Sequence, residues 1–317
     1  MIDVSIIIVS YNTARLTCDA VASVYHRTRN ISFEIIVVDN NSDDESVALL
    51  QQNFPSLRII CLETNIGFAA ANNLAAETAR GRYFLLLNPD TIVLSSSIDK
   101  IVSFADENPR YGIYGGSTFY GDMSRNPTAG WNMSTPWSLL CSASGLSSLF
   151  RDSRRFNPES LSWWNWNKPM EVDIVTGCFL LIPSELWHRL GGFDTRFYMY
   201  GEDADLCLRS AAINRFCIIV PDAEIIHFGG ASESIRADKL IRLLRAKTQL
   251  FRKHWGNVGS TYAVIMLKIW SLSRTIVFRI LTLFDKKHEG SFRSWQKVWI
   301  SRREWSRKAE HVGVLSE

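Results

Sequence analysis

Residues 4–9 of the chain read Val4-Ser5-Ile6-Ile7-Ile8-Val9, and this mainly β-branched run decides the fold class. Uninterrupted runs of this kind are typical of strands that are buried on both faces of a parallel sheet. Phe33–Val38 and Tyr83–Leu87 are further buried strands, and stretches that favour helices lie between them. Strands and helices that alternate at this pitch predict a parallel sheet with right-handed crossovers.

Other elements follow from hydrophobic periodicity and turn residues. The sequence predicts helices over Thr13–Thr28, Ser46–Phe54, Phe68–Ala79, Ser184–Leu190 (with Ser184 as N-cap) and Asp203–Ala212, and strands over Leu57–Leu62, Val172–Ile182 and Phe216–Val220. From Arg236 onward the pattern is helical and basic. We therefore expect an α/β protein with a mostly parallel central sheet, flanking helices and a C-terminal helical extension.

The composition is that of a globular protein, because 46% of the 317 residues are hydrophobic and 21% are charged. The formal net charge is +3, from 35 basic and 32 acidic residues, which predicts no nucleic-acid partner. Six cysteines form no CxxC pair, so we expect reduced thiols and a cytoplasmic protein. The N-terminal residues lack a basic region and a cleavage site, so no secretory signal peptide is expected.

Polar residues follow the predicted strands at their carboxyl ends, where parallel sheets bind ligands. They are Ser10-Tyr11-Asn12, Asp39 and Asn88-Pro89-Asp90. Asp39 can accept a hydrogen bond from a nucleobase or a ribose hydroxyl, or it can cap the following helix. Asp90 beside a diphosphate can complete the shell of Mg²⁺ or Mn²⁺, and an ordinary proline turn is the alternative.

Acidic residues also cluster at a predicted helix start, in Gly201-Glu202-Asp203-Ala204-Asp205. The helix dipole explains part of this clustering. A well-placed carboxylate is also the general base that a sugar hydroxyl needs when it acts as a nucleophile. His227, which follows a later strand, is either structural or a neutral imidazole ligand of a metal.

Together these elements resemble family 2 glycosyltransferases of the GT-A fold and, more narrowly, their bacterial rhamnosyltransferase-like branch. The resemblance covers about residues 1–255 and depends on the order of its motifs, because each motif alone is a weak signal. The motifs are Ile6-Ile7-Ile8-Val9-Ser10-Tyr11-Asn12, Asp39-Asn40-Asn41-Ser42, Asn65-Ile66-Gly67-Phe68 with Asn72-Asn73, Asn88-Pro89-Asp90, Gly192-Phe193-Asp194, Gly201-Glu202-Asp203 and His227-Phe228-Gly229.

The resemblance implies an inverting hexosyltransferase with a nucleotide-sugar donor, a divalent metal (Mg²⁺ or Mn²⁺) and a saccharide or lipid-linked acceptor. It implies that Asp203 is the catalytic base, that Glu202 helps to hold the acceptor, and that Asp90 and His227 bind the metal. The donor-binding residues that it implies are Ser10, Tyr11, Asn12, Asp39, Asn65, Gly67, Asn72, Asn88 and Asp90.

The sequence departs from the family at Asn88, where the Asp-x-Asp motif has its first acid. An asparagine still offers a carbonyl oxygen to the sugar or to a water, but one carboxylate fewer leaves the metal's identity and affinity open. The branch suggests dTDP-L-rhamnose as donor, with other UDP- or dTDP-sugars as alternatives. The acceptor implied is a glycan or lipid-linked saccharide in bacterial surface polysaccharide synthesis.

The expected organisation is a GT-A catalytic domain over residues 1–255, with an acceptor-side insertion over residues 121–168. The insertion contains several turn residues and the cluster Trp163, Trp164 and Trp166. These tryptophans are expected either to form a platform for the acceptor sugar or to be core beneath the insertion. A basic, amphipathic helical extension is expected over residues 256–317.

The extension contains a long apolar stretch, but Lys268, Arg274 and Arg279 interrupt it. Such charges disfavour a membrane-spanning helix and favour one that lies on a membrane surface. Residues 260–305 are therefore expected on the inner face of the plasma membrane, and tryptophans at positions 270, 295, 299 and 305 fit an interfacial helix. Packing on the catalytic domain or in a homodimer is the alternative.

Three other classes of protein compete with this interpretation. A nucleotidyltransferase needs a basic, glycine-rich phosphate loop near the N-terminus, and residues 10–15 contain no glycine. A dehydrogenase needs a GxGxxG motif after the first strand, which is missing. A catalytically dead sugar-nucleotide-binding or scaffold protein on the same fold stays open because of Asn88, although intact Asp90, Asp203 and His227 argue against it.

Overall fold

The computed structural model describes residues 2–229 and 236–307. The chain divides into two compact units, each of which uses two separate stretches of sequence. The first unit holds the central sheet, and the second is helical. The first unit comprises residues 1–133 and 164–232, and the second comprises residues 134–163 and 233–317.

The first unit is built on a ten-stranded mixed sheet whose main strand order is β3-β2-β1-β4-β11-β6-β12-β5. A separate pair consists of β8 (Gly130–Trp131) and β10 (Ile174–Val175). The strands of the large sheet are β1 (Val4–Ser10), β2 (Phe33–Asp39), β3 (Arg58–Cys61), β4 (Tyr83–Leu87), β5 (Thr91–Val93), β6 (Ile113–Phe119), β7 (Arg125–Asn126), β9 (Met170–Val172), β11 (Phe179–Pro183) and β12 (Cys217–His227).

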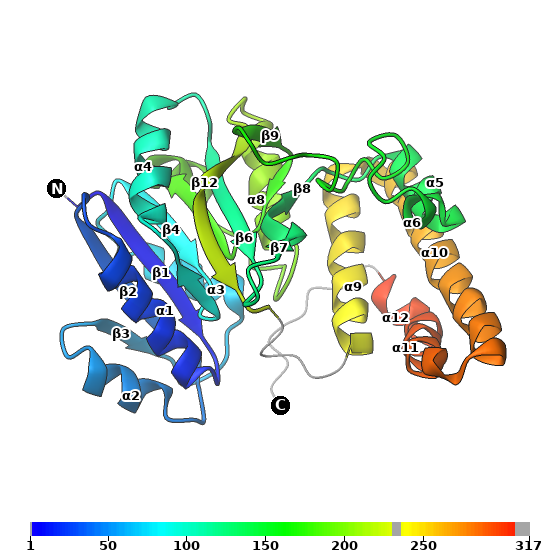
Figure 1. Ribbon diagram of the computed structural model, residues 1–317, viewed down its shortest axis with the longest axis horizontal. Coiled ribbons are helices and arrows are strands. Elements are labelled where there is room, and N and C mark those ends of the chain that lie inside the picture. The colour runs from blue at the N-terminus through cyan, green and yellow to red at the C-terminus, as the bar shows by residue number, and fades with distance from the viewer. Residues whose placement is uncertain (1, 230–235, 308–317) are drawn as a thin grey trace. The chain divides into compact units, whose positions relative to one another are not determined.

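The parallel half of this sheet sets the position of the predicted site (Figure 1). In the register of β1 with β2, Ser10 lies opposite Asp39, so the two strands end side by side. β4 pairs with the other edge of β1, also in parallel. The predicted central strands and their parallel pairing are therefore confirmed, and their polar carboxyl ends share one edge of the sheet.

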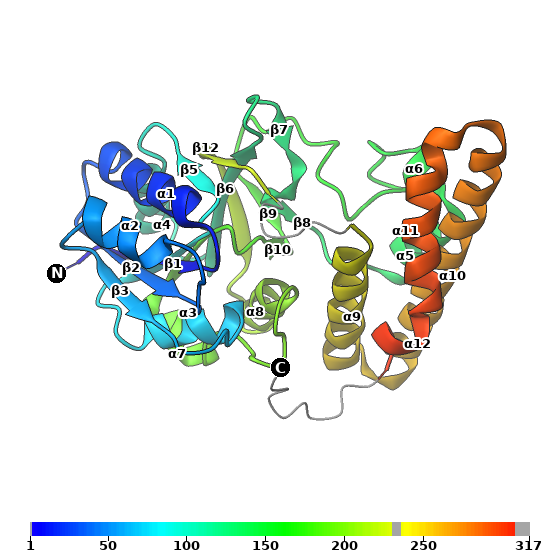
Figure 2. The same cartoon turned by 90° about the horizontal axis from the view of Figure 1, so that it is seen from below.

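Helices cover both faces of the sheet (Figure 2), as the buried pattern of its strands requires. Alternate residues of β1, β2 and β4 share one hydrophobic cluster with α1, α2 and α4. On the other face, the Trp187 ring of α7 packs edge-on against Phe84 of β4. The helices of this unit are α1 (Ala14–Arg27), α2 (Ser46–Asn53), α3 (Phe68–Ala76), α4 (Ser97–Glu107), α7 (Ser184–Leu190) and α8 (Glu202–Ala211), with a 3₁₀ turn, η1 (Pro127–Ala129).

Two local predictions are wrong. The strand predicted over Val172–Ile182 is broken into β9, β10 and β11, which pair with different neighbours. Ser184 is not an N-cap but the first residue of α7, and its hydroxyl donates to the carbonyl of Arg82. Continuous apolar runs carry no signal for breaks that are set by distant strand partners, so the sequence pattern could not show the first of these.

The second unit consists of helices alone among the residues that the structure describes in it. A long helix, α10, packs on α5, α9 and α11. Trp305 is fully buried, and its indole N–H donates to the carbonyl of Val298. The helices are α5 (Pro136–Ser144), α6 (Leu146–Leu149), α9 (Arg236–His254), α10 (Gly256–Phe284), η2 (Lys286–His288), α11 (Glu289–Ile300) and α12 (Arg302–Trp305).

This second unit departs from the expected organisation in two ways. α9 packs with α10, α11 and α12, whereas the sequence-based boundary at residue 255 placed it with the sheet. Residues 134–163, the middle of the expected insertion, also belong to the helical unit, where α5 lies against α10. Part of the C-terminal extension, residues 308–317, lies outside the described residues.

The tryptophans of the extension are mostly internal. Trp295 and Trp305 are buried, and Trp270 packs edge-on against Trp295 with ring centroids 4.9 Å apart. The expectation that they mark a membrane interface is therefore wrong for Trp295 and Trp305, because other helices of the unit cover them. No helix among the described residues is long and apolar enough to cross a membrane.

Candidate active site

Asp39 ends β2 and is almost completely buried. One carboxylate oxygen, Oδ2, accepts a hydrogen bond from the N–H of Ser42 at 3.0 Å, which shapes the loop after the strand. The other oxygen, Oδ1, is buried and has no hydrogen-bond partner among the residues that the structure describes. A buried carboxylate oxygen that lacks a donor is costly, so this position fits a ligand N–H or hydroxyl.

The loop that follows β1 contains the next three predicted residues. Ser10 is buried, and its hydroxyl shares hydrogen bonds with Thr13 and Thr17, so it shapes the loop from inside. Tyr11 is exposed. Asn12 is in the left-handed region with φ of 53°, and its side-chain oxygen accepts from the N–H of Asp43 at 2.8 Å. The loops after β1 and β2 are thus tied together.

Asn65 lies at the centre of a hydrogen-bond network. Its Oδ1 accepts from the Asn40 amide at 2.9 Å, from the Gly67 N–H at 3.0 Å and from the Tyr198 hydroxyl at 3.1 Å. The side-chain oxygen of Asn40 in turn accepts a hydrogen bond from the N–H of Ile66, the residue after Asn65. Sequence reasoning missed Tyr198, because no local pattern indicates a partner 133 residues away.

Gly67 is required by both conformation and space. Its φ is +83°, and a Cβ at this position would lie 2.8 Å from the ring of Tyr198. Only glycine combines that backbone conformation with such a close approach. Gly67 therefore allows Tyr198 to cover the loop that holds Asn65.

The pair Asn72-Asn73 divides into two roles. Asn72 is buried in α3, where its amide donates to the carbonyl of Phe68. Its Oδ1 has no partner in the described part of the chain. Asn73 makes two reciprocal bonds with the backbone of Phe193, at 2.8 and 2.9 Å. These bonds hold the Gly192-Phe193-Asp194 motif on α3, so Asn73 is a positioning residue that the predicted site did not include.

Asn88, Asp90 and His227 meet between the end of β4 and the end of β12. His227 Nε2 lies 3.3 Å from Asp90 Oδ1 and 3.5 Å from Asn88 Nδ2. The antiparallel pairing of β5 with β12 sets this arrangement by placing His227 opposite Thr91. The second oxygen of Asp90 accepts from the N–H of Gly229 at 3.1 Å.

This group fits a divalent metal through the chemistry of its donors. A carboxylate and an imidazole are both ordinary ligands of Mn²⁺, and Asp90 and His227 converge from different strands. Among the described residues, no cluster of three or more His, Cys, Asp or Glu side chains could hold a metal ion. Asp90 and His227 alone would leave further positions of a metal held here to other oxygen ligands.

The charges of this pair favour each other. Burial lowers the pKa of the His227 imidazole, but the neighbouring Cys178 and Asp90 outweigh burial and raise it to about 10. Burial raises the pKa of Asp90, but His227 and the Gly229 N–H outweigh it and hold it below its ordinary value. Asp90 and His227 therefore each favour the charged form of the other.

Glu202 and Asp203 open α8 and are both buried. Asp203 Oδ2 accepts from the N–H of Gly177 at 3.1 Å, and Oδ1 accepts from the N–H of Ala204 at 2.7 Å. Glu202 Oε2 is buried and has no partner within residues 2–229 and 236–307. Each Asp203 oxygen keeps a lone pair beyond its backbone bond, so this carboxylate is fixed in place and still able to accept a proton.

The environment of the pair raises both pKa values. Burial, followed by the charge of Asp203, raises the pKa of Glu202 to about 8. Burial also raises the pKa of Asp203, against the lowering effect of its backbone hydrogen bonds. Buried carboxylates with raised pKa values are what general-base chemistry near neutral pH uses.

The segment Thr176–Cys178 precedes β11. It connects the carboxylate pair, Glu202 and Asp203, to the metal-type cluster, which is Asn88, Asp90 and His227. Its Gly177 N–H binds Asp203, and its Cys178 carbonyl accepts from the N–H of Asn88 at 3.0 Å. Cys178 also lies beside His227, where it affects the imidazole pKa. The structure thus brings together Asp203, Asn88, Asp90 and His227 through a segment that sequence reasoning did not single out.

The predicted acceptor tryptophans are mainly internal. Trp164 and Trp166 are buried and stack on each other with ring centroids 4.1 Å apart. The Arg125 guanidinium lies 4.5 Å from the centre of the Trp166 ring. Trp163, which belongs to the second unit, has Arg154 over its ring at 4.9 Å. Trp164 and Trp166 therefore adopt the alternative role, that of core residues.

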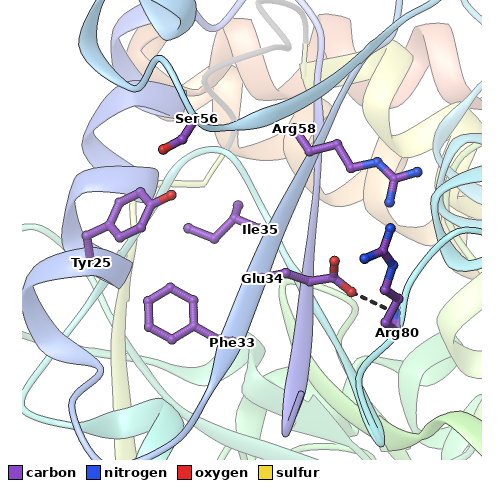
Figure 3. A pocket seen from close by; sticks show the side chains of 7 residues that line it. All are labelled: Tyr25, Phe33, Glu34, Ile35, Ser56, Arg58 and Arg80. Carbon is purple, nitrogen blue, oxygen red and sulfur yellow. Dashed lines mark hydrogen bonds between the residues drawn. The ribbon is translucent and has the colours of Figure 1, made fainter. Parts of the chain in front are cut away.

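A separate pocket of about 370 Å³ lies at the other end of the strands (Figure 3). Phe33 begins β2 and Arg58 begins β3, so the pocket is at the amino ends, away from Asp39. Ligands of parallel sheets bind at carboxyl ends, so we do not assign this pocket to the site. Its lining residues are Tyr25, Phe33, Glu34, Ile35, Ser56, Arg58 and Arg80.

Comparison with known proteins identifies the class. The family model described as Glycosyl transferase family 2 matches residues 5–180. An N-acetylglucosaminyl-diphospho-decaprenol L-rhamnosyltransferase of Mycobacterium tuberculosis is 26% identical over 215 residues, which cover 61% of this chain and 66% of that protein. The O-antigen biosynthesis protein RfbC of Myxococcus xanthus is 30% identical over 248 residues, which cover 75% of this chain but only 18% of that protein.

A solved structure has the same fold. The mannosyltransferase of Pyrobaculum calidifontis, in complex with GDP-Man and Mn²⁺, superposes with a TM-score of 0.59. It is 15% identical, and the match covers 96% of this chain and 86% of that one. The fold of this chain is thus the GT-A fold of that glycosyltransferase. The chain belongs to glycosyl transferase family 2.

We predict that Gly67→Ala weakens nucleotide-sugar binding at least about tenfold. The added Cβ meets the ring of Tyr198, so the loop that holds Asn65 must move. Gly145→Ala is the matched control, because Gly145 has a similar φ of +87° but a Cβ added there would have no atom within 4 Å. Calorimetric titration of both variants checks this, and equal binding by both would show that the contact with Tyr198 is not needed.

Proposed function

We propose that the protein transfers L-rhamnose from dTDP-L-rhamnose to a hydroxyl of a lipid-linked saccharide, in the synthesis of a bacterial surface polysaccharide. The names of the mycobacterial and Myxococcus relatives support the sugar and the pathway class. The chain spans 66% and 18% of these relatives, so the assignment is made for the residues matched. A lipid-linked acceptor places the enzyme at the inner face of the plasma membrane.

One observation carries the proposal. The structure gathers a fixed carboxylate, Asp203, and a metal-type pair, Asp90 and His227, around the segment Thr176–Cys178. Sugar transfer from a nucleotide diphosphate needs a base on the acceptor side and positive charge on the leaving-group side. A protein that only binds a nucleotide sugar, without catalysis, does not need a base on the acceptor side.

Each residue then has a chemical role. Asp39, through its unpartnered Oδ1, binds the nucleoside, and the Asn65 network shapes the donor pocket. Asp90 and His227 would hold the metal, which supplies positive charge to the leaving diphosphate. Asp203 takes the proton from the acceptor hydroxyl as its oxygen attacks the anomeric carbon and the bond to the diphosphate breaks. Attack from the face opposite the leaving group inverts the configuration.

The donor is tested by calorimetric titration of the protein with dTDP-rhamnose, UDP-glucose, UDP-galactose and UDP-N-acetylglucosamine, with and without Mn²⁺ or Mg²⁺. We expect dTDP-rhamnose to bind only when the metal is present. The Asp39→Ala variant should bind it at least about tenfold more weakly, because a hydrogen bond to a charged group is removed. Asp222→Ala removes an exposed carboxylate and serves as the control. Binding of another sugar alone would refute rhamnose, and binding of none would favour the dead-fold alternative.

Asp203→Asn tests the base. We expect turnover to fall by about 10² to 10⁴ while donor binding survives, because the amide keeps the shape but cannot accept the proton. Glu202→Gln is the matched comparison, with the same change of charge one residue away. A large loss in Glu202→Gln with normal turnover in Asp203→Asn would transfer the role of base to Glu202.

The pH dependence of turnover follows from the raised pKa values of this pair. At low pH the pair carries an extra proton, and the base becomes free as pH rises through the raised pKa. We therefore expect kcat to increase with pH along an acid limb that lies above the ordinary carboxyl range, because burial raises the pKa of Asp203. Glu202→Gln removes one of two like charges and should shift this limb to lower pH. An acid limb near the ordinary carboxyl pKa would contradict the buried, coupled pair.

A further inference from the structure

The helix α10 of the second unit has one face buried by its neighbours and an opposite face that is exposed and apolar. The buried residues Ser260, Ala263, Leu267 and Ser271 recur at intervals of three and four. The exposed apolar residues follow intervals of three, four and seven, which on a helix place them on one common face. They are Ile265, Ile269, Ile276, Ile280 and Leu283.

The exposure of this face is large for a soluble surface. Ile276 and Ile280 are 50% and 49% exposed, and Leu283 is 71% exposed. Contiguous apolar surface of this kind usually marks an interaction site. The helical unit exposes further large apolar side chains outside α10, namely Trp137, Leu140, Leu149, Phe150 and Ile300.

The charges of α10 are of one sign. Its 29 residues contain no aspartate or glutamate, and its three charged residues are Lys268, Arg274 and Arg279. Arg274 points to the interior of the unit, where it donates to the Ser148 hydroxyl. Lys268 and Arg279 each lie one residue before an isoleucine of the exposed face, and Arg279 is itself exposed. The apolar face is therefore bordered by cations.

We propose that this face of α10 docks on the surface of an anionic phospholipid bilayer. An apolar face of isoleucine and leucine inserts into the boundary between headgroups and acyl chains, and the bordering cations attract the headgroup phosphates. The helix lies in the plane of the surface, because its opposite face is already covered by the rest of the unit. If two copies of this chain met through this face, the cations that border it on each copy would repel one another. This repulsion disfavours self-association through the face.

The test is co-sedimentation of the full chain with phosphatidylcholine–phosphatidylglycerol vesicles and with pure phosphatidylcholine vesicles. We expect stronger binding to the anionic vesicles. The double variant Ile276→Glu with Ile280→Glu should lower the partition coefficient at least about tenfold, because apolar contact is replaced by carboxylates. Lys268→Gln and Arg279→Gln should each weaken binding to the anionic vesicles about fivefold.

The control is Phe216→Glu, which places the same charge at an apolar residue of the first unit that is 48% exposed. Circular dichroism establishes that each variant is folded. Equal binding by the double variant and the native chain, equal loss in Phe216→Glu, or no binding to anionic vesicles would overturn the proposal. So would a native dimer, seen by light scattering without lipid, that the double variant dissociates.

This docking surface does not depend on the donor or on the transfer chemistry. The residues that carry it belong to the helical unit, and the candidate active site belongs to the sheet unit. Titration of the double variant with nucleotide sugar separates the two: unchanged donor binding with lost vesicle binding is the expected result. Loss of both would show that the variant is generally damaged and would count against the proposal.

Discussion

Burial of the parallel strands on both faces is the constraint on which the rest of the molecule depends. Every residue of β1 and β4 is buried, so these strands offer no side chain to a ligand along their length. Polar groups can emerge only where the strands end, and β1 and β2 end in register at Ser10 and Asp39. The position of the candidate site is therefore a consequence of how the core is covered.

Local signals were sufficient for the elements that build this core. The β-branched run of residues 4–9 and the strand over Tyr83–Leu87 match β1 and β4 closely, because buried strands carry a strong local pattern. The strand predicted over Val172–Ile182 failed because its breaks depend on pairing with β4, β8 and β12, which are distant in sequence. The same limit hid the helical unit, whose α5 and α10 lie more than a hundred residues apart.

The candidate site shows the same division. Motif residues such as Asp39, Asp90 and His227 could be chosen from the sequence because they follow strands and carry the right chemistry. The residues that position them, such as Tyr198 and Gly177, act through long-range backbone or side-chain bonds. Nothing in their local sequence distinguishes them from ordinary turn residues.

Four of the eight buried side-chain polar atoms that lack a partner among the described residues belong to residues of the candidate site. They are Asp39 Oδ1, Asn72 Oδ1, Glu202 Oε2 and His227 Nδ1. Each such atom costs roughly 1–3 kcal/mol of folding free energy. A fold that was selected for stability alone would not concentrate these costs in a few residues. A ligand that supplies the missing partners stabilises the native state as it binds, so stability and substrate recognition are coupled in this protein.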